Sequence, residues 1–221
     1  MRAVLAVTLG VVSGFAQAGE LACDNGIVQA TAENADTAAA ICAASDAALA
    51  QLGRCDLPMP KAPLSIVTQE DLGDNCVGLF HCGESLIEIL PPEKLSEKRS
   101  ELGLFQALSD ERLFESVIQH EIAHAVYDRT PCPIDTCIAS SEYFAYVVQI
   151  MALTDPERDA VLADLDETVQ IGRDVINPFV LFMAPDRFAL LSWQHISQRG
   201  DRCAYLRQVV DGSIVFDREH P

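Results

Sequence analysis

The set of eight cysteines constrains the fold of this 221-residue chain more than any other feature. None of them form a CxxC pair, the spacing typical of zinc–thiolate sites, so disulfides are favoured over a zinc cluster. An even number of cysteines in an exported chain predicts four disulfides. Two of these would close short loops, Cys76–Cys82 and Cys132–Cys137, and the pairing of the other four stays open. The full set is Cys23, Cys42, Cys55, Cys76, Cys82, Cys132, Cys137 and Cys203.

The first 18 residues have the pattern of a signal peptide. A positively charged start precedes an apolar run at 3–15 that is too short to span a membrane as a mature helix. Residues 16–18 are Ala-Gln-Ala, so we expect cleavage after Ala18 and export to the periplasm or the extracellular space. A buried N-terminal helix is the alternative. Lipid attachment at Cys23 is disfavoured by the charge of the nearby Glu20.

The charge of the chain excludes several classes of partner. Lys and Arg number 15 against 33 Asp and Glu, which gives a net charge of −18 without any basic run. Such a chain repels the phosphates of nucleic acids and anionic membranes, so we expect neither as a partner. No later run approaches a membrane span, and we expect a soluble mature monomer. Residues 19–221 are enough for a single domain.

Strand patterns precede helix patterns along the chain, which predicts an α+β fold. Short apolar runs bounded by turn residues predict strands at 64–67, 77–80 and 86–90. Capping residues, acidic first turns and terminal glycines predict helices at 31–53, 109–127, 138–153, from 154 onward and at 186–199. The expected architecture is a small sheet followed by a helical C-terminal half, held together by disulfides.

Residues 120–124, His-Glu-Ile-Ala-His, are the strongest chemical signal in the chain. Histidines four residues apart lie one turn apart on the same helix face, so His120 and His124 can reach one cation. Glu121 lies beside them, where it can polarise a metal-bound water. Apolar residues continue this helix face and indicate a partly buried site. Two histidines with this spacing by chance are the alternative.

A catalytic zinc ion needs three protein ligands and one open position. Glu142 lies 18 residues beyond His124, near the start of the next predicted helix, and a glutamate is unexpected among its apolar neighbours. It is our candidate for the third ligand, although favourable placement in the first turn of a helix would also explain it. Asp128, one turn beyond His124, is the rival. Three ligands on one straight helix converge poorly, so we place Asp128 second.

The motif at His120, Glu121 and His124 resembles that of the zincin metallopeptidases, and the later Glu142 resembles their gluzincin branch. The resemblance implies that His120, His124 and Glu142 bind Zn²⁺ and that Glu121 is the general base. It also implies a zincin-like domain with an edge strand for extended substrate, which we place at 86–90. The domain would comprise a metal-site core at about 60–155 and a helical part at about 155–221.

The block HEIAHAVYDRTPCP…CIASSEYFAY further resembles an uncharacterised family of exported bacterial proteins of unknown function, over about residues 60–155. The chain also departs from the gluzincin pattern. Tyr146 lies one turn after Glu142, where an aspartate often orients a ligand histidine. Ser141 precedes Glu142, where an asparagine is usual, and no third histidine has the metzincin spacing.

We therefore expect an exported zinc-dependent hydrolase, foremost a small metallopeptidase that acts on peptides or proteins with a zinc-bound water and a glutamate base. The alternatives are a non-catalytic exported binding protein that retains a zincin-like fold, and a disulfide-stapled interaction module with a fortuitous motif. Tyr127, Tyr143 and Tyr146 could donate to a developing oxyanion, but packing roles explain them better. We expect His81 at the surface and His195 in the core.

Overall fold

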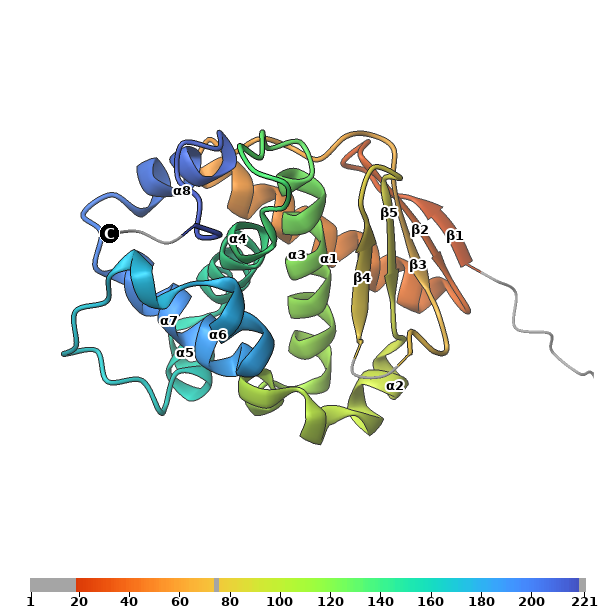
Figure 1. Ribbon diagram of the computed structural model, residues 1–221. Helices are drawn as coiled ribbons and strands as arrows, with labels where there is room; N and C mark the ends of the chain where they lie inside the picture. The colour runs from red at the N-terminus through yellow and green to blue at the C-terminus, as the bar shows by residue number, and fades with distance from the viewer. Residues whose placement is uncertain (1–18, 74–75, 219–221) are drawn as a thin grey trace, which may run out of the picture.

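The computed structural model describes residues 19–73 and 76–218, so the predicted signal peptide at 1–18 lies outside the described residues. The described chain is a mixed α+β structure, as the order of the sequence patterns predicted. Most of the helices lie on one side of a small sheet, and α3 (Asp110–Tyr127) stands directly beside it (Figure 1). A buried core cluster extends from Cys23 to Phe216 and connects the sheet with the helices.

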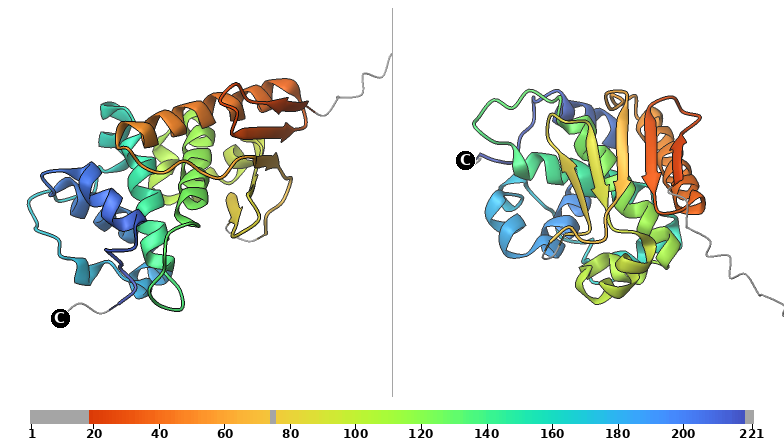
Figure 2. Two further views of the ribbon diagram at one scale, coloured as in Figure 1. Left: turned by 90° about the horizontal axis from the view of Figure 1, so that it is seen from above. Right: turned by 90° about the vertical axis from the view of Figure 1, so that its right-hand side faces the viewer.

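The sheet has five strands in the order β1-β2-β3-β5-β4 (Figure 2). Its two inner contacts, β2 with β3 and β3 with β5, are parallel, and the two outer contacts, β1 with β2 and β4 with β5, are antiparallel. Side chains alternate between the two faces of a strand. Ile66 of β3 and Ile87 of β5 are paired in register, so they share one face, and both are fully buried. The strands are β1 (Gly19–Ala22), β2 (Val28–Ala32), β3 (Leu64–Thr68), β4 (Gly78–His81) and β5 (Leu86–Ile89).

The edge strand next to α3 is β4, and our placement of this edge at 86–90 was wrong. β5 pairs with β3 on one side and with β4 on the other, so its backbone groups are used inside the sheet. The chain reverses after His81, and β5 returns between β3 and β4 because it pairs in parallel with β3. Within the described residues β4 therefore has a strand neighbour on one side only, and β4 contacts α3.

The helices begin largely where the sequence predicted. The Ser109 hydroxyl accepts the Arg112 N–H at the start of α3, and a capping box formed by Thr154 and Glu157 opens α5. The predicted helix at 31–53 begins later, because residues 28–32 are strand β2. The strands β1 and β2 and the helices α2, α6 and α8 were not expected. Besides α3, the helices are α1 (Ala35–Arg54), α2 (Pro92–Glu97), α4 (Ile138–Met151), α5 (Asp155–Val161), α6 (Pro178–Met183), α7 (Pro185–Ser197) and α8 (Arg202–Val210), with 3-10 turns η1 (Arg99–Glu101), η2 (Gly103–Ala107) and η3 (Arg173–Val175).

Helix packing places α3 at the centre of the molecule. α3 contacts α1 and the edge strand β4, and its most extensive helix contact is with α4. α4 in turn contacts α7 and α8, so the C-terminal helices support it from the side away from the sheet (Figure 2). α3 and α4 are the two helices that carry the histidine motif and Glu142.

The described residues form three disulfides, Cys23–Cys42, Cys55–Cys203 and Cys132–Cys137, of which Cys55–Cys203 joins residues 148 positions apart. The predicted Cys132–Cys137 pair is confirmed, whereas the expected fourth disulfide between Cys76 and Cys82 is wrong. Both of these cysteines are free. They flank β4, whose four extended residues alone span about 10–13 Å, more than the Cα separation of about 6 Å that a disulfide needs.

This arrangement predicts the number of titratable thiols. The chain unfolded in denaturant without reductant should have two thiols, at Cys76 and Cys82, because the other six cysteines are paired. Thiol titration with peptide mapping measures both the number and the positions. A chain without any thiol would show that Cys76 and Cys82 are oxidised and would contradict the arrangement.

Candidate metal centre and its groove

The two histidines of the motif face α4 from one side of α3. Their four-residue spacing brings the ring centroids to 4.7 Å and the two Nε2 atoms to 3.0 Å. Each side chain is 14% exposed, so the pair is mostly withdrawn from water but still reachable. The face of α3 that was expected to be partly buried is therefore the face that carries His120 and His124.

Glu142 approaches this pair from α4. One carboxylate oxygen lies 3.5 Å from Nε2 of His120 and the other lies 3.5 Å from Nε2 of His124. His120, His124 and Glu142 thus come together within metal-binding distance. The Asp128 carboxylate instead accepts the backbone N–H of Gly83 at 3.2 Å. Glu142, rather than the rival Asp128, completes the group of three.

A second layer of hydrogen bonds orients both imidazole rings. Nδ1 of His120 lies 3.0 Å from Oε1 of Gln149, whose Nε2 donates to Ser116 Oγ at 2.7 Å. An amide oxygen only accepts, so Nδ1 of His120 carries a proton, and in the neutral ring Nε2 keeps its lone pair. Nδ1 of His124 lies 2.9 Å from the Ser141 hydroxyl. Gln149 and Ser141 therefore orient the rings of His120 and His124.

The electrostatics of the group favour the metal-binding protonation states of His124 and Glu142. Burial, with the positive charge of His120, lowers the pKa of His124 to about 4. Burial also opposes a charge on His120, but the hydrogen bond and charge of Glu142 outweigh it and raise the His120 pKa. Burial alone would raise the pKa of Glu142, yet the two histidines hold it below its usual value. At neutral pH His124 is thus neutral and Glu142 is ionised, the forms in which these residues bind metals.

Glu121 reaches the edge strand β4. Its side chain is 6% exposed and hydrogen-bonds to the backbone of Phe80. A methyl group on Gly78 would lie 2.6 Å from Oε1 of Glu121, so only glycine lets the strand and the carboxylate come this close. Burial raises the pKa of Glu121 to about 7, against the opposing charge of His120. A carboxyl group with such a pKa can both accept and release a proton near neutral pH.

A groove of about 970 Å³ lies over these side chains. β4 and its flanking residues form one wall, and α3, α4, the loop at 130–138 and the start of α7 form the other. Tyr146 lies in this wall, with its ring edge-to-face with His120 at 4.8 Å and stacked on Phe105 at 6.3 Å. Burial and the charge of Glu142 raise the pKa of Tyr146, so its hydroxyl remains a donor.

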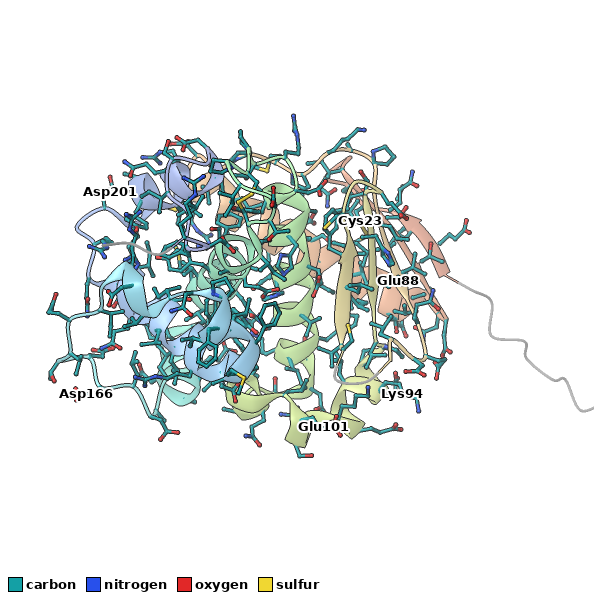
Figure 3. All side chains as sticks on the ribbon, in the orientation of Figure 1. Cys23, Glu88, Lys94, Glu101, Asp166 and Asp201 are labelled. Carbon is teal, nitrogen blue, oxygen red and sulfur yellow. A yellow bond between two sulfur atoms is a disulfide. The ribbon has the colours of Figure 1, made fainter. Side chains whose placement is uncertain are left out.

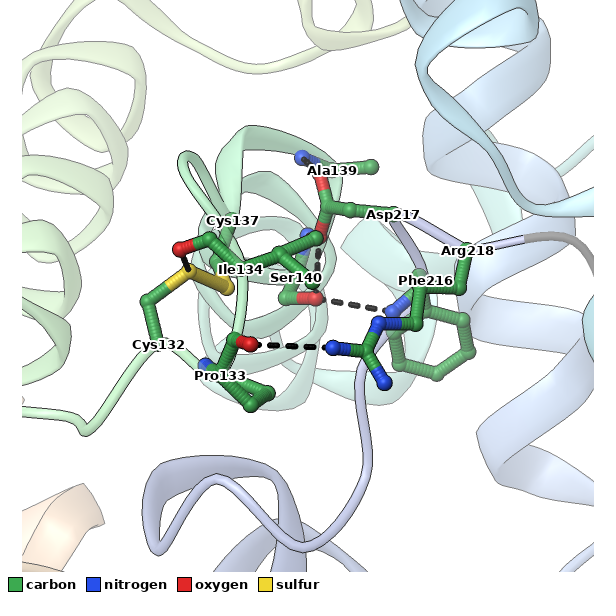
Figure 4. Close-up of a disulfide and its surroundings, with 9 residues drawn as sticks. All are labelled: Cys132, Pro133, Ile134, Cys137, Ala139, Ser140, Phe216, Asp217 and Arg218. Atoms are coloured by element: carbon green, nitrogen blue, oxygen red, sulfur yellow. Dashed lines mark hydrogen bonds between the residues drawn. A yellow bond between two sulfur atoms is a disulfide. The ribbon is translucent and has the colours of Figure 1, made fainter.

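The start of α4 is held by a residue far away in the sequence. Its N-cap position provides no side-chain hydrogen bond, and Asp217 takes this role by accepting the N–H groups of Ala139 at 2.7 Å and Ser140 at 3.0 Å (Figure 4). The Ser140 hydroxyl also donates to Asp217 at 2.5 Å. The Cys132–Cys137 disulfide closes the loop that leads into the helix. These contacts fix the helical turn that carries the third candidate ligand.

The remaining candidates lie away from the group of three. Tyr143 is buried and its hydroxyl lies 2.9 Å from Nδ1 of His195, which is itself fully buried, as expected. Burial, with the charge of Arg199, lowers the pKa of His195 to about 3. His81 is half-buried at the outer face of the sheet, where its Nε2 lies 2.8 Å from the Glu88 carboxylate. Of the candidate tyrosines Tyr127, Tyr143 and Tyr146, it is Tyr146 whose ring contacts His120 of the motif.

Comparison with known proteins places the chain in a family. Residues 28–219 match the model of DUF6639, a family of unknown function. The chain belongs to DUF6639. The match confirms the expected uncharacterised family and extends beyond residues 60–155 at both ends, so it includes all residues of the group described above. Among the curated proteins and the solved structures, no match to this DUF6639 chain is found.

The close approach of Gly78 to Glu121 yields a prediction for stability. Gly78→Ala should lower the free energy of unfolding by about 1–3 kcal/mol, because the added methyl group displaces a buried carboxylate or the strand. Gly53→Ala is the matched control. Gly53 lies in α1 with only the end of the Met59 side chain near its Cβ position, so alanine should be neutral or stabilising there. Urea unfolding measures both, and equal stability of the two variants would contradict the close approach.

Proposed function

We propose that this DUF6639 protein is an exported zinc-dependent hydrolase, foremost a metallopeptidase. The observation that carries the proposal is the meeting of His120, His124 and Glu142 in a groove, with the buried carboxylate of Glu121 next to them. Two imidazoles and one carboxylate leave room for a further ligand, as in catalytic rather than structural zinc sites.

The spacing of the three side chains supports a zinc ion. Zinc is bound by histidine nitrogens and carboxylate oxygens at about 2.0–2.2 Å, so neighbouring ligands of a tetrahedral ion lie about 3.3–3.5 Å apart. The two histidine Nε2 atoms lie 3.0 Å apart, and each lies 3.5 Å from one of the two Glu142 carboxylate oxygens. When bound, zinc would polarise a scissile carbonyl group and lower the pKa of water in the site.

Glu121 is the residue that we assign to proton transfer. Its pKa of about 7 suits a group that accepts a proton from the attacking water and delivers it to the leaving amine. The backbone contact with Phe80 holds its carboxylate at the groove wall. Tyr146, in contact with His120, can donate a hydrogen bond to the oxygen that becomes negative as the carbonyl is attacked.

The edge strand supports a peptide as the substrate class. β4 has a free side within the described residues and lines the groove, so an extended peptide can pair with its backbone N–H and C=O groups. Such pairing would hold the substrate backbone in register above the two histidines, largely independent of its side chains.

Export is part of the proposal. The three disulfides are consistent with an oxidising compartment, and the signal-like start of the sequence is consistent with export. In the part of the chain that the structure describes, no helix has both the length and the apolar character to cross a membrane.

Substitutions of the group test the proposal. His120→Ala and His124→Ala should each abolish zinc binding, because two remaining ligands hold the ion poorly, and Glu142→Ala should weaken it. His81→Ala and Asp128→Ala are matched controls outside the group and should keep one zinc per chain. Metal analysis and titration calorimetry measure the binding.

Glu121→Gln separates the chemistry from the metal. It should keep zinc but lose hydrolysis of a mixed peptide library by about 10²–10⁴-fold, because the amide cannot accept the proton. Zinc loss in Asp128→Ala together with full binding in Glu142→Ala would overturn the ligand assignment. One zinc per chain without turnover of any peptide would instead favour the non-catalytic binding protein.

The hydrogen bonds of Gln149 and Ser141 to the two histidine rings give a separate prediction. Gln149→Ala and Ser141→Ala should each weaken zinc binding by about 10–100-fold, because the rings of His120 and His124 lose their orienting partners. Gln106→Ala, an exposed position outside the site, should leave the affinity unchanged. Unchanged affinity in both site variants would show that these hydrogen bonds do not prepare the histidines for a metal.

A further inference from the structure

The groove has a one-sided charge. Its lining includes carboxylates but no lysine or arginine among the described residues. Apart from Glu121 and Glu142, the acidic residues of the lining are Glu101, Asp128, Asp135 and Asp186. None of these four forms an ion pair within the described part of the chain, although other surface carboxylates do pair, such as Asp110 with Arg99.

Asp128 is fixed at one end of the groove. It follows the last residue of α3, and its two carboxylate oxygens each lie 3.2 Å from the backbone N–H of Gly83, just beyond the end of β4. The side chain is exposed. This contact bridges 45 residues of sequence and uses the carboxylate only as an acceptor, so its negative charge stays available to a ligand.

Asp186 is fixed toward the other end, where the chain enters α3. Its Oδ1 atom accepts the N–H of Leu104 at 3.4 Å and lies directly against the backbone of Gly103. Gly103 has a φ of +52°, and any side chain at this position would occupy the space of the carboxylate. Asp186 is close enough to Tyr146 for its charge to raise the pKa of that hydroxyl. Glu101 lies near the same end (Figure 3).

We propose that the groove selects extended peptides with lysine or arginine side chains on both sides of the metal centre. Positive side chains would lie against Asp128 at one end and against Asp186 at the other, while the peptide backbone lies along β4. The inference rests on the proposed function for the position of the peptide. Fixed charges of one sign in a groove attract ligands of the opposite sign and exclude ligands of the same sign.

The experiment measures binding without hydrolysis. The full mature chain with Glu121→Gln is titrated, with and without added zinc, into two fluorescein-labelled peptides of equal length. One is an alanine-based peptide with three arginines, and the other has glutamate in place of each arginine. Fluorescence anisotropy should show binding of the arginine peptide at least tenfold tighter than that of the glutamate peptide, with the difference shrinking in high salt.

Single substitutions locate the site of binding. Asp128→Asn and Asp186→Asn keep the oxygen that accepts the backbone N–H, and each should weaken binding of the arginine peptide by about threefold to tenfold. Glu20→Gln, on the strand β1 at the far edge of the sheet, removes the same charge and should change the affinity less than twofold.

Equal weakening in all three variants would show attraction to the overall negative charge and would overturn the inference. Unchanged affinity in Asp128→Asn and Asp186→Asn would overturn it as well. If the wild-type chain hydrolyses basic and acidic peptides equally, the substrate class is wrong while the proposed function stands. If no peptide is hydrolysed but the arginine peptide binds with the expected losses, the groove assignment stands and the enzymatic function is wrong.

Discussion

The interface between α3 and α4 buries two imidazoles and a carboxylate against one another, and the rest of the site depends on this contact. Burying such groups is unfavourable unless each finds a partner. Here Gln149 and Ser141 satisfy the Nδ1 atoms, which leaves the Nε2 atoms and the Glu142 oxygens facing one small volume. A cation in that volume would offset the cost of burial for all three groups, and among the described residues no lysine or arginine lines the groove to do so.

The parts of the site that were predictable from the sequence are those that local rules determine. The helical spacing of His120 and His124 follows from the α-helix repeat, and Ser109 marks the start of their helix. Glu142 could be proposed because a charged residue was out of place in an apolar helix. The α+β class followed in the same way from the order of short strands and capped helices along the chain.

The parts that could not be predicted depend on contacts between residues that are distant in sequence. Asp217 caps a helix that begins 79 residues earlier, and the partner of Cys55 lies 148 residues away. Cys76 and Cys82 were predicted to close a loop, but pairing with β5 extends the chain between them, and both cysteines are free. The same pairing made β4 the edge strand. In each case tertiary pairing, which no local pattern records, decided the outcome.

The location of the bound metal tests the account most directly. Crystals of the mature protein grown with zinc can be measured on both sides of the zinc absorption edge, and the anomalous difference map then shows the ion. We expect one strong peak per chain, at about 2.0–2.2 Å from Nε2 of His120, Nε2 of His124 and a carboxylate oxygen of Glu142. A map without a peak at these three side chains, or with zinc bound at Cys76 or Asp128 instead, would contradict the account.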